Sequence, residues 1–343
     1  MKRKRVQTTH IILLSSFWLS SFWWLSLATA MAQPMSSRST TAASYVERGV
    51  SWLEKGEWKR AMADFDLAIA SDPNFPAAYN GRGVAQWQLK DCERAAADFT
   101  RAISLNPRFA DSYVNRGKVK YWMGDMDGAI SDSARSIELN PKSPTGWYVR
   151  GLARNGSRDF NGALDDFNQA IKRNPHDAEY FSCRGMARLN LGDVDGAISD
   201  QTAAIKLNPD FSVAWDERGA AREKKGDFEG ALADYNKAIA LAPGHAQSWA
   251  DRGAIWKTLG NLERAEADFT HAIELNPDLT DARVQRGLLR MTRGHVDEAQ
   301  QDFDYCLLNR DLPPSLKRLI TEAKHRIMSR NPRQSPAPFK SPR

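Results

Sequence analysis

The sequence predicts an all-α protein, a solenoid of eight tandem helical hairpins that each span 34 residues. Prolines recur every 34 residues from Pro73 to Pro277. Counted from Ala42, the same interval places a glycine at the eighth position and an alanine at the twentieth position of all eight repeats. The fourth position is aromatic in seven repeats and the twenty-fourth in six. A repeat of this length cannot bury its apolar face alone, so neighbouring repeats are expected to stack and form the core together.

The repeats cover residues 42–313. Their bounds are 42–75, 76–109, 110–143, 144–177, 178–211, 212–245, 246–279 and 280–313. In each repeat, the first aromatic residue, the glycine and the eleventh residue are spaced i, i+4 and i+7, which predicts one face of a first helix. The alanine and the second aromatic residue mark a second helix in the same way. Turns such as Gly124-Asp125 lie between the helices, where glycine permits an unusual backbone angle and aspartate caps the next helix.

The segment before the repeats has the pattern of an export signal. A basic start is followed by an apolar run from Ile11 to Leu27 and by the small residues of Ala28-Thr29-Ala30. This order predicts a signal peptide over residues 1–32, and hence a periplasmic or secreted protein. The alternative is a retained membrane anchor formed by residues 11–30, because a span needs roughly 17–25 apolar residues. Residues 33–41 are predicted to be a flexible linker.

The segment after the repeats is basic. Residues 314–330 predict a capping helix, with a polar outer face, that closes the open end of the solenoid. Its expected apolar stripe consists of Leu316, Leu319, Ile320, Ala323 and Ile327, and its expected outer residues are Lys317, Arg318, Lys324 and Arg326. Residues 331–343 are predicted to be a disordered basic tail. Residues 314–343 hold eight Lys or Arg and one acid, so the basic ends account for the positive net charge of +6 and the repeats are mildly acidic. A nucleic-acid surface along the repeats is therefore not expected.

The unit length, the aromatic–glycine pair, the alanine, the second aromatic residue and the proline resemble the tetratricopeptide repeat. The resemblance covers residues 42–313. It implies a right-handed superhelix whose concave groove is lined by the first helices. It also implies a non-catalytic protein-interaction scaffold, here of an exported bacterial type because of residues 1–32.

Two charged positions depart from the usual pattern of the resembled family. The seventh position, usually leucine there, is arginine in all eight repeats. These arginines are Arg48, Arg82, Arg116, Arg150, Arg184, Arg218, Arg252 and Arg286. The twenty-third position is aspartate in all eight, namely Asp64, Asp98, Asp132, Asp166, Asp200, Asp234, Asp268 and Asp302. Antiparallel helices would bring the two positions together, which predicts a ladder of structural ion pairs. A row of arginines that bind an anionic ligand is the alternative.

Catalytic motifs are missing from the sequence, which has no Gly-rich phosphate loop, no HExxH and no Cys-x-x-Cys. The three cysteines, Cys92, Cys183 and Cys306, are too far apart along the repeats to pair and are expected to be free thiols. The sequence therefore predicts no enzyme activity, no cofactor and no metal site.

The predicted partner-binding groove is mostly apolar and aromatic. Its expected residues are Asn80, Val84, Trp87, Val114, Lys118, Tyr121, Tyr148, Leu152 and Met186. Such a surface favours an apolar peptide or helix of a partner protein. Two alternatives stay open: Trp87 and Tyr121 pack between hairpins, or the basic C-terminal segment binds an anionic polymer or a membrane surface. Membrane contact is otherwise expected only through an uncleaved signal.

Overall fold

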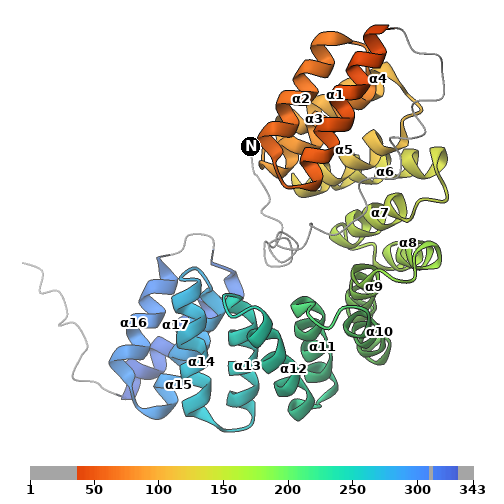
Figure 1. Ribbon diagram of the computed structural model, residues 1–343. Coiled ribbons are helices and arrows are strands. Elements are labelled where there is room, and N and C mark those ends of the chain that lie inside the picture. The colour runs from red at the N-terminus through yellow and green to blue at the C-terminus, as the bar shows by residue number, and fades with distance from the viewer. Residues whose placement is uncertain (1–36, 309–311, 331–343) are drawn as a thin grey trace, which may run out of the picture. The chain divides into compact units, whose positions relative to one another are not determined.

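The fold is all-α. A computed structural model of the chain describes residues 37–308 and 312–330, and these residues form seventeen helices and no strand (Figure 1). The predicted signal peptide and basic tail lie outside the described residues. No helix in the described ranges is long and apolar enough to cross a membrane. The chain divides into two compact units at Asp193/Val194, between the two helices of the fifth repeat, and each unit is described by itself.

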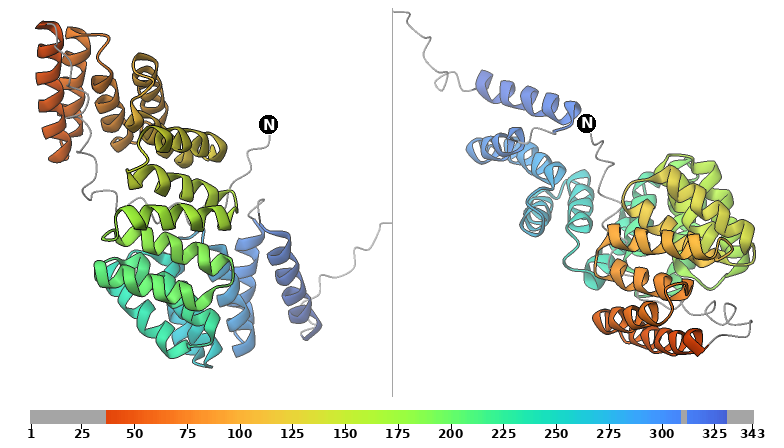
Figure 2. Two further views of the ribbon diagram at one scale, coloured as in Figure 1. Left: turned by 90° about the vertical axis from the view of Figure 1, so that its right-hand side faces the viewer. Right: turned by 90° about the horizontal axis from the view of Figure 1, so that it is seen from above.

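The N-terminal unit holds nine helices. They are α1 (Ser37–Glu54), α2 (Trp58–Ser71), α3 (Pro76–Gln88), α4 (Cys92–Leu105), α5 (Ala110–Trp122), α6 (Met126–Leu139), α7 (Pro144–Gly156), α8 (Phe160–Arg173) and α9 (Ala178–Asn190). The C-terminal unit holds eight. They are α10 (Val194–Leu207), α11 (Ser212–Lys225), α12 (Phe228–Leu241), α13 (Ala246–Thr258), α14 (Leu262–Leu275), α15 (Thr280–Arg293), α16 (Val296–Leu307) and α17 (Pro314–Arg330). Within each unit, each helix packs against the next one along the chain (Figure 2).

The turn inside each hairpin follows the sequence chemistry. The Asp125 carboxylate accepts a hydrogen bond from the backbone N–H of Gly128 and so caps α6. The residue directly before the N-cap residue of the second helix has a left-handed conformation, as at Gly124 with φ of +83°. Lys90 and Arg158 hold this turn position in two repeats and adopt φ of +66° without being glycine.

In six of the hairpins, the core contains an aromatic ring that packs against the glycine of the eighth position. The Phe99 ring is buried between α3 and α4, and a Cβ added to Gly83 would lie 2.8 Å from that ring. Glycine at the eighth position is therefore required by close approach of the ring, while alanine at the twentieth position lets the two helices come together.

Two details at the ends of the array differ from the sequence prediction. Residues 37–41, predicted as part of a flexible linker, form the first turn of α1, where the Ser39 hydroxyl donates to Asp72 at 2.7 Å. At the other end α17 buries Ile320, Ala323 and Ile327 against α15 and α16. Leu319, expected in the apolar stripe, is 36% exposed. It lies next to the buried row on the helix surface, so it reaches solvent instead of the core.

Candidate partner-binding site

Arginine–aspartate pairs connect the two helices of the hairpins. In seven repeats the arginine Nε and Nη2 atoms donate to the two oxygens of an aspartate 16 residues later, at 2.6 to 3.0 Å. The pairs are Arg48–Asp64, Arg82–Asp98, Arg116–Asp132, Arg150–Asp166, Arg218–Asp234, Arg252–Asp268 and Arg286–Asp302. Arg184 and Asp200 belong to different units, so their pairing stays a prediction.

Five of these seven arginines also contact the preceding repeat. The remaining guanidinium nitrogen, Nη1, donates to a side chain at the twenty-fifth position of the repeat before, as from Arg82 to Asp66 at 2.7 Å and from Arg252 to Asn236 at 2.7 Å. The guanidinium of Arg252 also lies over the Trp249 ring, 4.8 Å from its centroid. One arginine therefore ties together three helices from two repeats.

Several of the aspartates receive a second cation from the eleventh position. Arg154 donates to Asp166 at 2.8 Å, and Arg222 donates to Asp234 at 2.8 Å. The hydrogen bonds from Arg82 to its carboxylates raise the pKa of that arginine above its ordinary value. Since the guanidinium donors are used within the fold, the geometry favours the structural interpretation of the arginine row over the anion-binding one.

Five of the nine predicted groove residues are buried between neighbouring first helices. These are Asn80, Val84, Val114, Tyr148 and Leu152. The Asn80 side-chain oxygen accepts hydrogen bonds from Ser112 at 3.0 Å and from Asn115 at 3.2 Å, so it connects α3 to α5. The Tyr148 ring lies 4.9 Å from that of Tyr180 and is 3% exposed. The sequence does not reveal this burial, because it depends on how closely successive first helices approach.

The other four predicted groove residues, Trp87, Lys118, Tyr121 and Met186, are partly exposed. The Trp87 ring packs edge-on against Trp122 with centroids 5.8 Å apart, and the Lys90 ammonium lies 5.6 Å from the Trp122 ring centroid. The nine predicted residues stand at the fifth, ninth and twelfth positions of their repeats. Trp122 is missing from this set because it stands at the thirteenth position. Its aromatic character is the signal that would have identified it. Trp87, Trp122 and Tyr121 make up what we term the aromatic patch.

Lys118 of α5 and Glu179 of α9, two charged groups of the first helices, have shifted pKa values. Burial lowers the pKa of Lys118 to about 8, although Glu179 and Asp111 act in the opposite direction. Burial, with Asp177 adding to it, raises the pKa of Glu179 to about 7. Glu179 also accepts a hydrogen bond from the Tyr148 hydroxyl at 3.3 Å. These two groups are therefore charged groups in a poorly hydrated setting, where electrostatic interactions are stronger than in bulk water.

The first helices of the C-terminal unit carry acids. Asp216 accepts a hydrogen bond from Ser248 at 2.5 Å, and Asp251 accepts one from Gln247 at 2.7 Å. Burial, reinforced by Asp216, raises the pKa of Glu217 to about 8 and also raises the pKa of Asp251. Glu217 and Asp251 stand at the sixth position, whereas the predicted set contains only fifth, ninth and twelfth positions, so both acids are absent from it.

Within the described ranges, no three His, Cys, Asp or Glu side chains are grouped so as to hold a metal ion. The three cysteines are free thiols, with Cys183 and Cys306 buried. Burial raises the pKa of Cys306 to about 11, which keeps it in the unreactive thiol form.

Comparisons with protein families match the repeat pattern. A family model described as tetratricopeptide repeat matches residues 80–146, 148–212 and 183–246, and a second model of the same description matches residues 218–285. Together these matches span more than half of the chain. No curated protein matches it.

Two solved structures with TM-scores above 0.5 show the same fold. A tetratricopeptide repeat protein from Parabacteroides merdae is 19% identical, with a TM-score of 0.57, over 73% of this chain and 99% of that one. A chain of the APC/C hetero-tetramer Cut9–Hcn1 is 13% identical, with a TM-score of 0.64, over 84% of this chain and 57% of that one. YrrB, described as a TPR protein with an unusual peptide-binding site, is 24% identical over 55% of this chain and 96% of that one, with a TM-score of 0.44. On the family matches and the paired helices, the chain belongs to the tetratricopeptide repeat family, whose members generally serve as protein–protein interaction scaffolds.

Proposed function

We propose that this protein is a non-catalytic scaffold outside the cytoplasm that holds a peptide or an amphipathic helix of a partner protein against the first helices of its N-terminal unit. The observation that carries the proposal is the aromatic patch. Trp87, Trp122 and Tyr121 come from successive first helices and remain partly exposed. Partly exposed tryptophan and tyrosine side chains are the residues that most often dominate binding energy at protein interfaces.

The chemistry around the aromatic patch specifies the partner further. Lys90 lies over Trp122, and Lys118 lies among buried groups, so the apolar surface has cations at its edge. A partner segment with apolar anchors and a flanking carboxylate would satisfy both. The location outside the cytoplasm rests on the order of charge, apolar run and small residues in residues 1–32.

Photo-crosslinking in the native host tests the proposal. A photoreactive residue at position 87 is expected to capture a discrete partner. The matched control places the same residue at position 67, where Leu67 is 45% exposed on a second helix, and is expected not to capture that partner. Equal capture from both positions would contradict the proposal.

A second experiment measures affinity for the captured partner. The triple variant Trp87→Ala, Trp122→Ala, Tyr121→Ala removes the aromatic patch and should weaken binding at least about tenfold, since interface aromatics are each worth about 2 kcal/mol or more. Tyr148 is left intact because it is buried and its loss would disturb the fold. Unchanged affinity in a well-folded triple variant would exclude the patch. N-terminal sequencing of the native protein tests export separately: a chain that begins at Met1 would indicate a retained anchor.

The basic C-terminal segment supports a second candidate function, binding of an anionic polymer or a membrane surface. Lys317, Arg318 and Arg326 of α17 are exposed on its outer side. Binding through these residues should weaken strongly as the salt concentration rises, whereas binding at the aromatic patch should persist. A variant that ends at residue 330 and carries Gln in place of these three basic residues should lose the salt-sensitive binding.

A further inference from the structure

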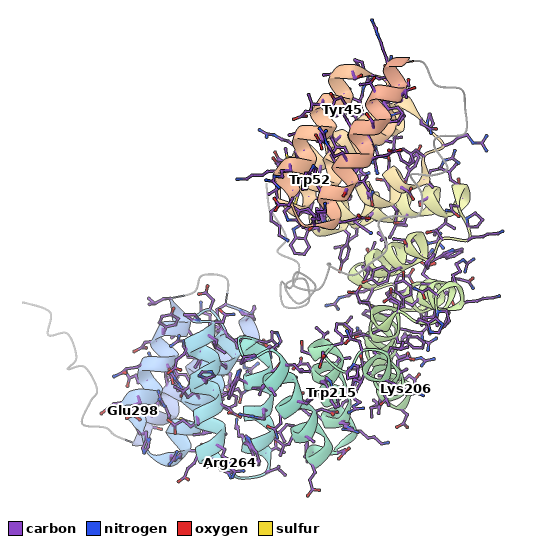
Figure 3. The ribbon with its side chains drawn as sticks, in the orientation of Figure 1. Tyr45, Trp52, Lys206, Trp215, Arg264 and Glu298 are labelled. Atoms are coloured by element: carbon purple, nitrogen blue, oxygen red, sulfur yellow. The ribbon has the colours of Figure 1, made fainter. Side chains whose placement is uncertain are left out.

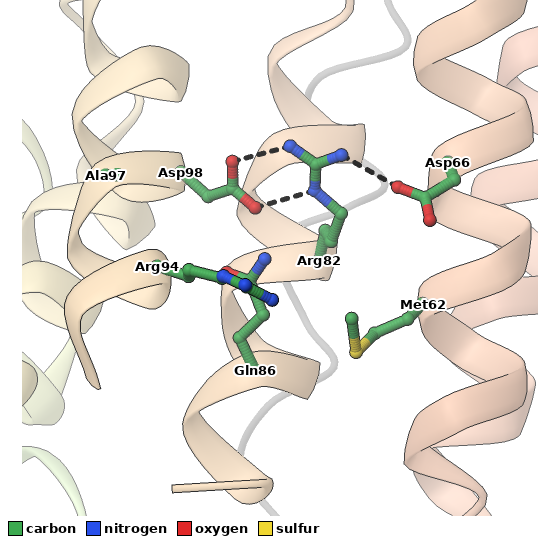
Figure 4. Close-up of a pocket in the computed structure, with 7 residues that line it drawn as sticks. All are labelled: Met62, Asp66, Arg82, Gln86, Arg94, Ala97 and Asp98. Carbon is green, nitrogen blue, oxygen red and sulfur yellow. Dashed lines mark hydrogen bonds and ion pairs between the residues drawn. The ribbon is translucent and has the colours of Figure 1, made fainter. Parts of the chain in front are cut away.

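A pocket of about 340 Å³ opens between the first two repeats, apart from the aromatic patch (Figure 4). Met62 and Asp66 of α2, Gln86 of α3, and Arg94 and Asp98 of α4 line it. Figure 4 shows Arg82 bridging Asp98 on one side and Asp66 on the other. The volume lies at the lower end of the range of small-ligand sites, roughly 300–1,000 Å³.

A buried side chain in this pocket has an unsatisfied polar atom. Gln86 is 6% exposed, and its Oε1 atom has no hydrogen-bond partner in the structure. Buried acceptors without a donor cost free energy and are rare in folded proteins. Asp98 beside it is 7% exposed, and its Oδ2 accepts from the Arg82 Nε at 2.7 Å. The pocket therefore contains one buried acceptor without a donor, Gln86 Oε1, next to a carboxylate that is already paired with Arg82.

Equivalent positions in other repeats show what fills this space. Gln86 stands at the eleventh position, where the first repeat has Trp52. Trp52 is labelled in Figure 3. Its indole donates the Nε1–H to Asp64 at 3.0 Å, and the Arg60 guanidinium lies 4.9 Å from the ring centroid. In the seventh repeat Trp256 lies under Arg264 in the same way, at 4.8 Å. Both arginines occupy the nineteenth position.

Other repeats place a cation at the eleventh position, and there the nineteenth residue is different. Arg154 and Arg222 each donate to the repeat's aspartate and also to the carbonyl oxygen of a glycine at the nineteenth position, Gly162 or Gly230. A glycine leaves the space free of a second positive charge. The chain thus combines tryptophan with arginine, or a basic residue with glycine, at these two positions in six of its eight repeats.

The second repeat has the arginine without the tryptophan. Arg94 stands at the nineteenth position, and its side chain is 75% exposed. A cationic ligand beside it would be repelled, whereas an aromatic ring would receive the same cation–π contact that Trp52 and Trp256 receive. Met62 at the pocket wall adds a sulfur that packs well against aromatic rings.

We infer that this pocket binds an indole ring, the side chain of a tryptophan of a partner protein. The ring inserts between Met62 and Arg94, and its single N–H donates to Gln86 Oε1, the buried acceptor that lacks a partner. The partner's tryptophan thereby takes the place that Trp52 and Trp256 hold within their own repeats. The site shares no residue with the aromatic patch and binds independently of it.

Titration of the full chain with N-acetyl-5-fluorotryptophanamide, followed by ¹⁹F NMR, tests the inference. The probe is expected to bind saturably, and its N1-methyl derivative, which lacks the indole N–H, is expected to bind more weakly. N-acetylarginine amide, tested by competition, is expected not to displace the probe. Displacement by the arginine compound, or equal binding of the methylated probe, would overturn the indole assignment.

Variants locate the binding site. Gln86→Trp fills the pocket from within and should abolish probe binding. Arg94→Ala removes an exposed cation and should weaken binding about two- to fivefold, the value of one exposed cation–π contact. The matched control Arg264→Ala removes the equivalent cation from the seventh repeat, where Trp256 already fills the space, and should leave binding unchanged. If Gln86→Trp fails to fold, the comparison of probe affinity between Arg94→Ala and Arg264→Ala tests the site. Equal affinities of these two variants for the probe would refute it.

Discussion

Removal of the Arg252 side chain tests whether the arginine ladder stabilises the fold. Asp268 is 5% exposed, and among the described residues Arg252 is the cation that pairs with it. Arg252→Ala therefore leaves a carboxylate buried without a counterion, and we expect a loss of about 3–5 kcal/mol in the free energy of unfolding. The Arg252 side chain is 17% exposed, so solvent screening reduces this value only modestly.

Arg218 provides a matched comparison. It pairs with Asp234 in the same geometry, but Asp234 also accepts from Arg222 at 2.8 Å. Arg218→Ala therefore removes hydrogen bonds without removing the last counterion, and the expected loss is about 2 kcal/mol. The double variant Arg252→Leu, Asp268→Leu removes both charges and should recover much of the loss caused by Arg252→Ala.

Urea unfolding followed by circular dichroism measures these differences. Because repeat arrays can unfold in parts, hydrogen exchange of the amides in α13 and α14 should be measured alongside to locate the loss. A loss below about 1 kcal/mol for Arg252→Ala, or a larger loss for Arg218→Ala than for Arg252→Ala, would refute the proposed role of the ladder.

Three further changes have defined outcomes. Gly83→Ala should lower stability by about 1–3 kcal/mol, because the new Cβ would lie 2.8 Å from the Phe99 ring; a melting temperature equal to that of the parent would show that the ring can move away. Arg158→Gly should raise stability by about 1 kcal/mol in urea unfolding, because Arg158 holds φ of +66° and is exposed. Burial and Asp216 raise the pKa of Glu217 to about 8 in the folded chain, whereas the pKa of a glutamate in the unfolded chain is about 4.3. Between these two pH values the folded chain keeps a proton on Glu217 that the unfolded chain has lost. The stability contributed by this group therefore falls as the pH rises from about 4.3 to about 8. Glu217→Gln should reduce the fall in melting temperature between about pH 5 and about pH 9. A pH profile of the melting temperature identical to that of the parent would contradict this assignment.

Features repeated within one hairpin could be predicted from the sequence. The 34-residue period, the glycine against the aromatic ring and the 16-residue spacing from Arg to Asp are all relations between two adjacent antiparallel helices. The short turn fixes which positions of those helices meet, so the partners of Arg82 and Gly83 follow from counting. The all-α fold was predicted on the same basis and is confirmed.

Relations between one repeat and the next were decided only by the tertiary structure. Counting placed Asn80 and Tyr148 on an exposed groove, but successive first helices approach so closely that both are buried. The contact of Arg82 with Asp66 of the preceding repeat could not be predicted either, because it joins two repeats. The pocket beside Gln86 arises from the same boundary between repeats. How far two stacked hairpins approach depends on the volumes of side chains from four helices, and the period of the sequence carries no measure of that distance.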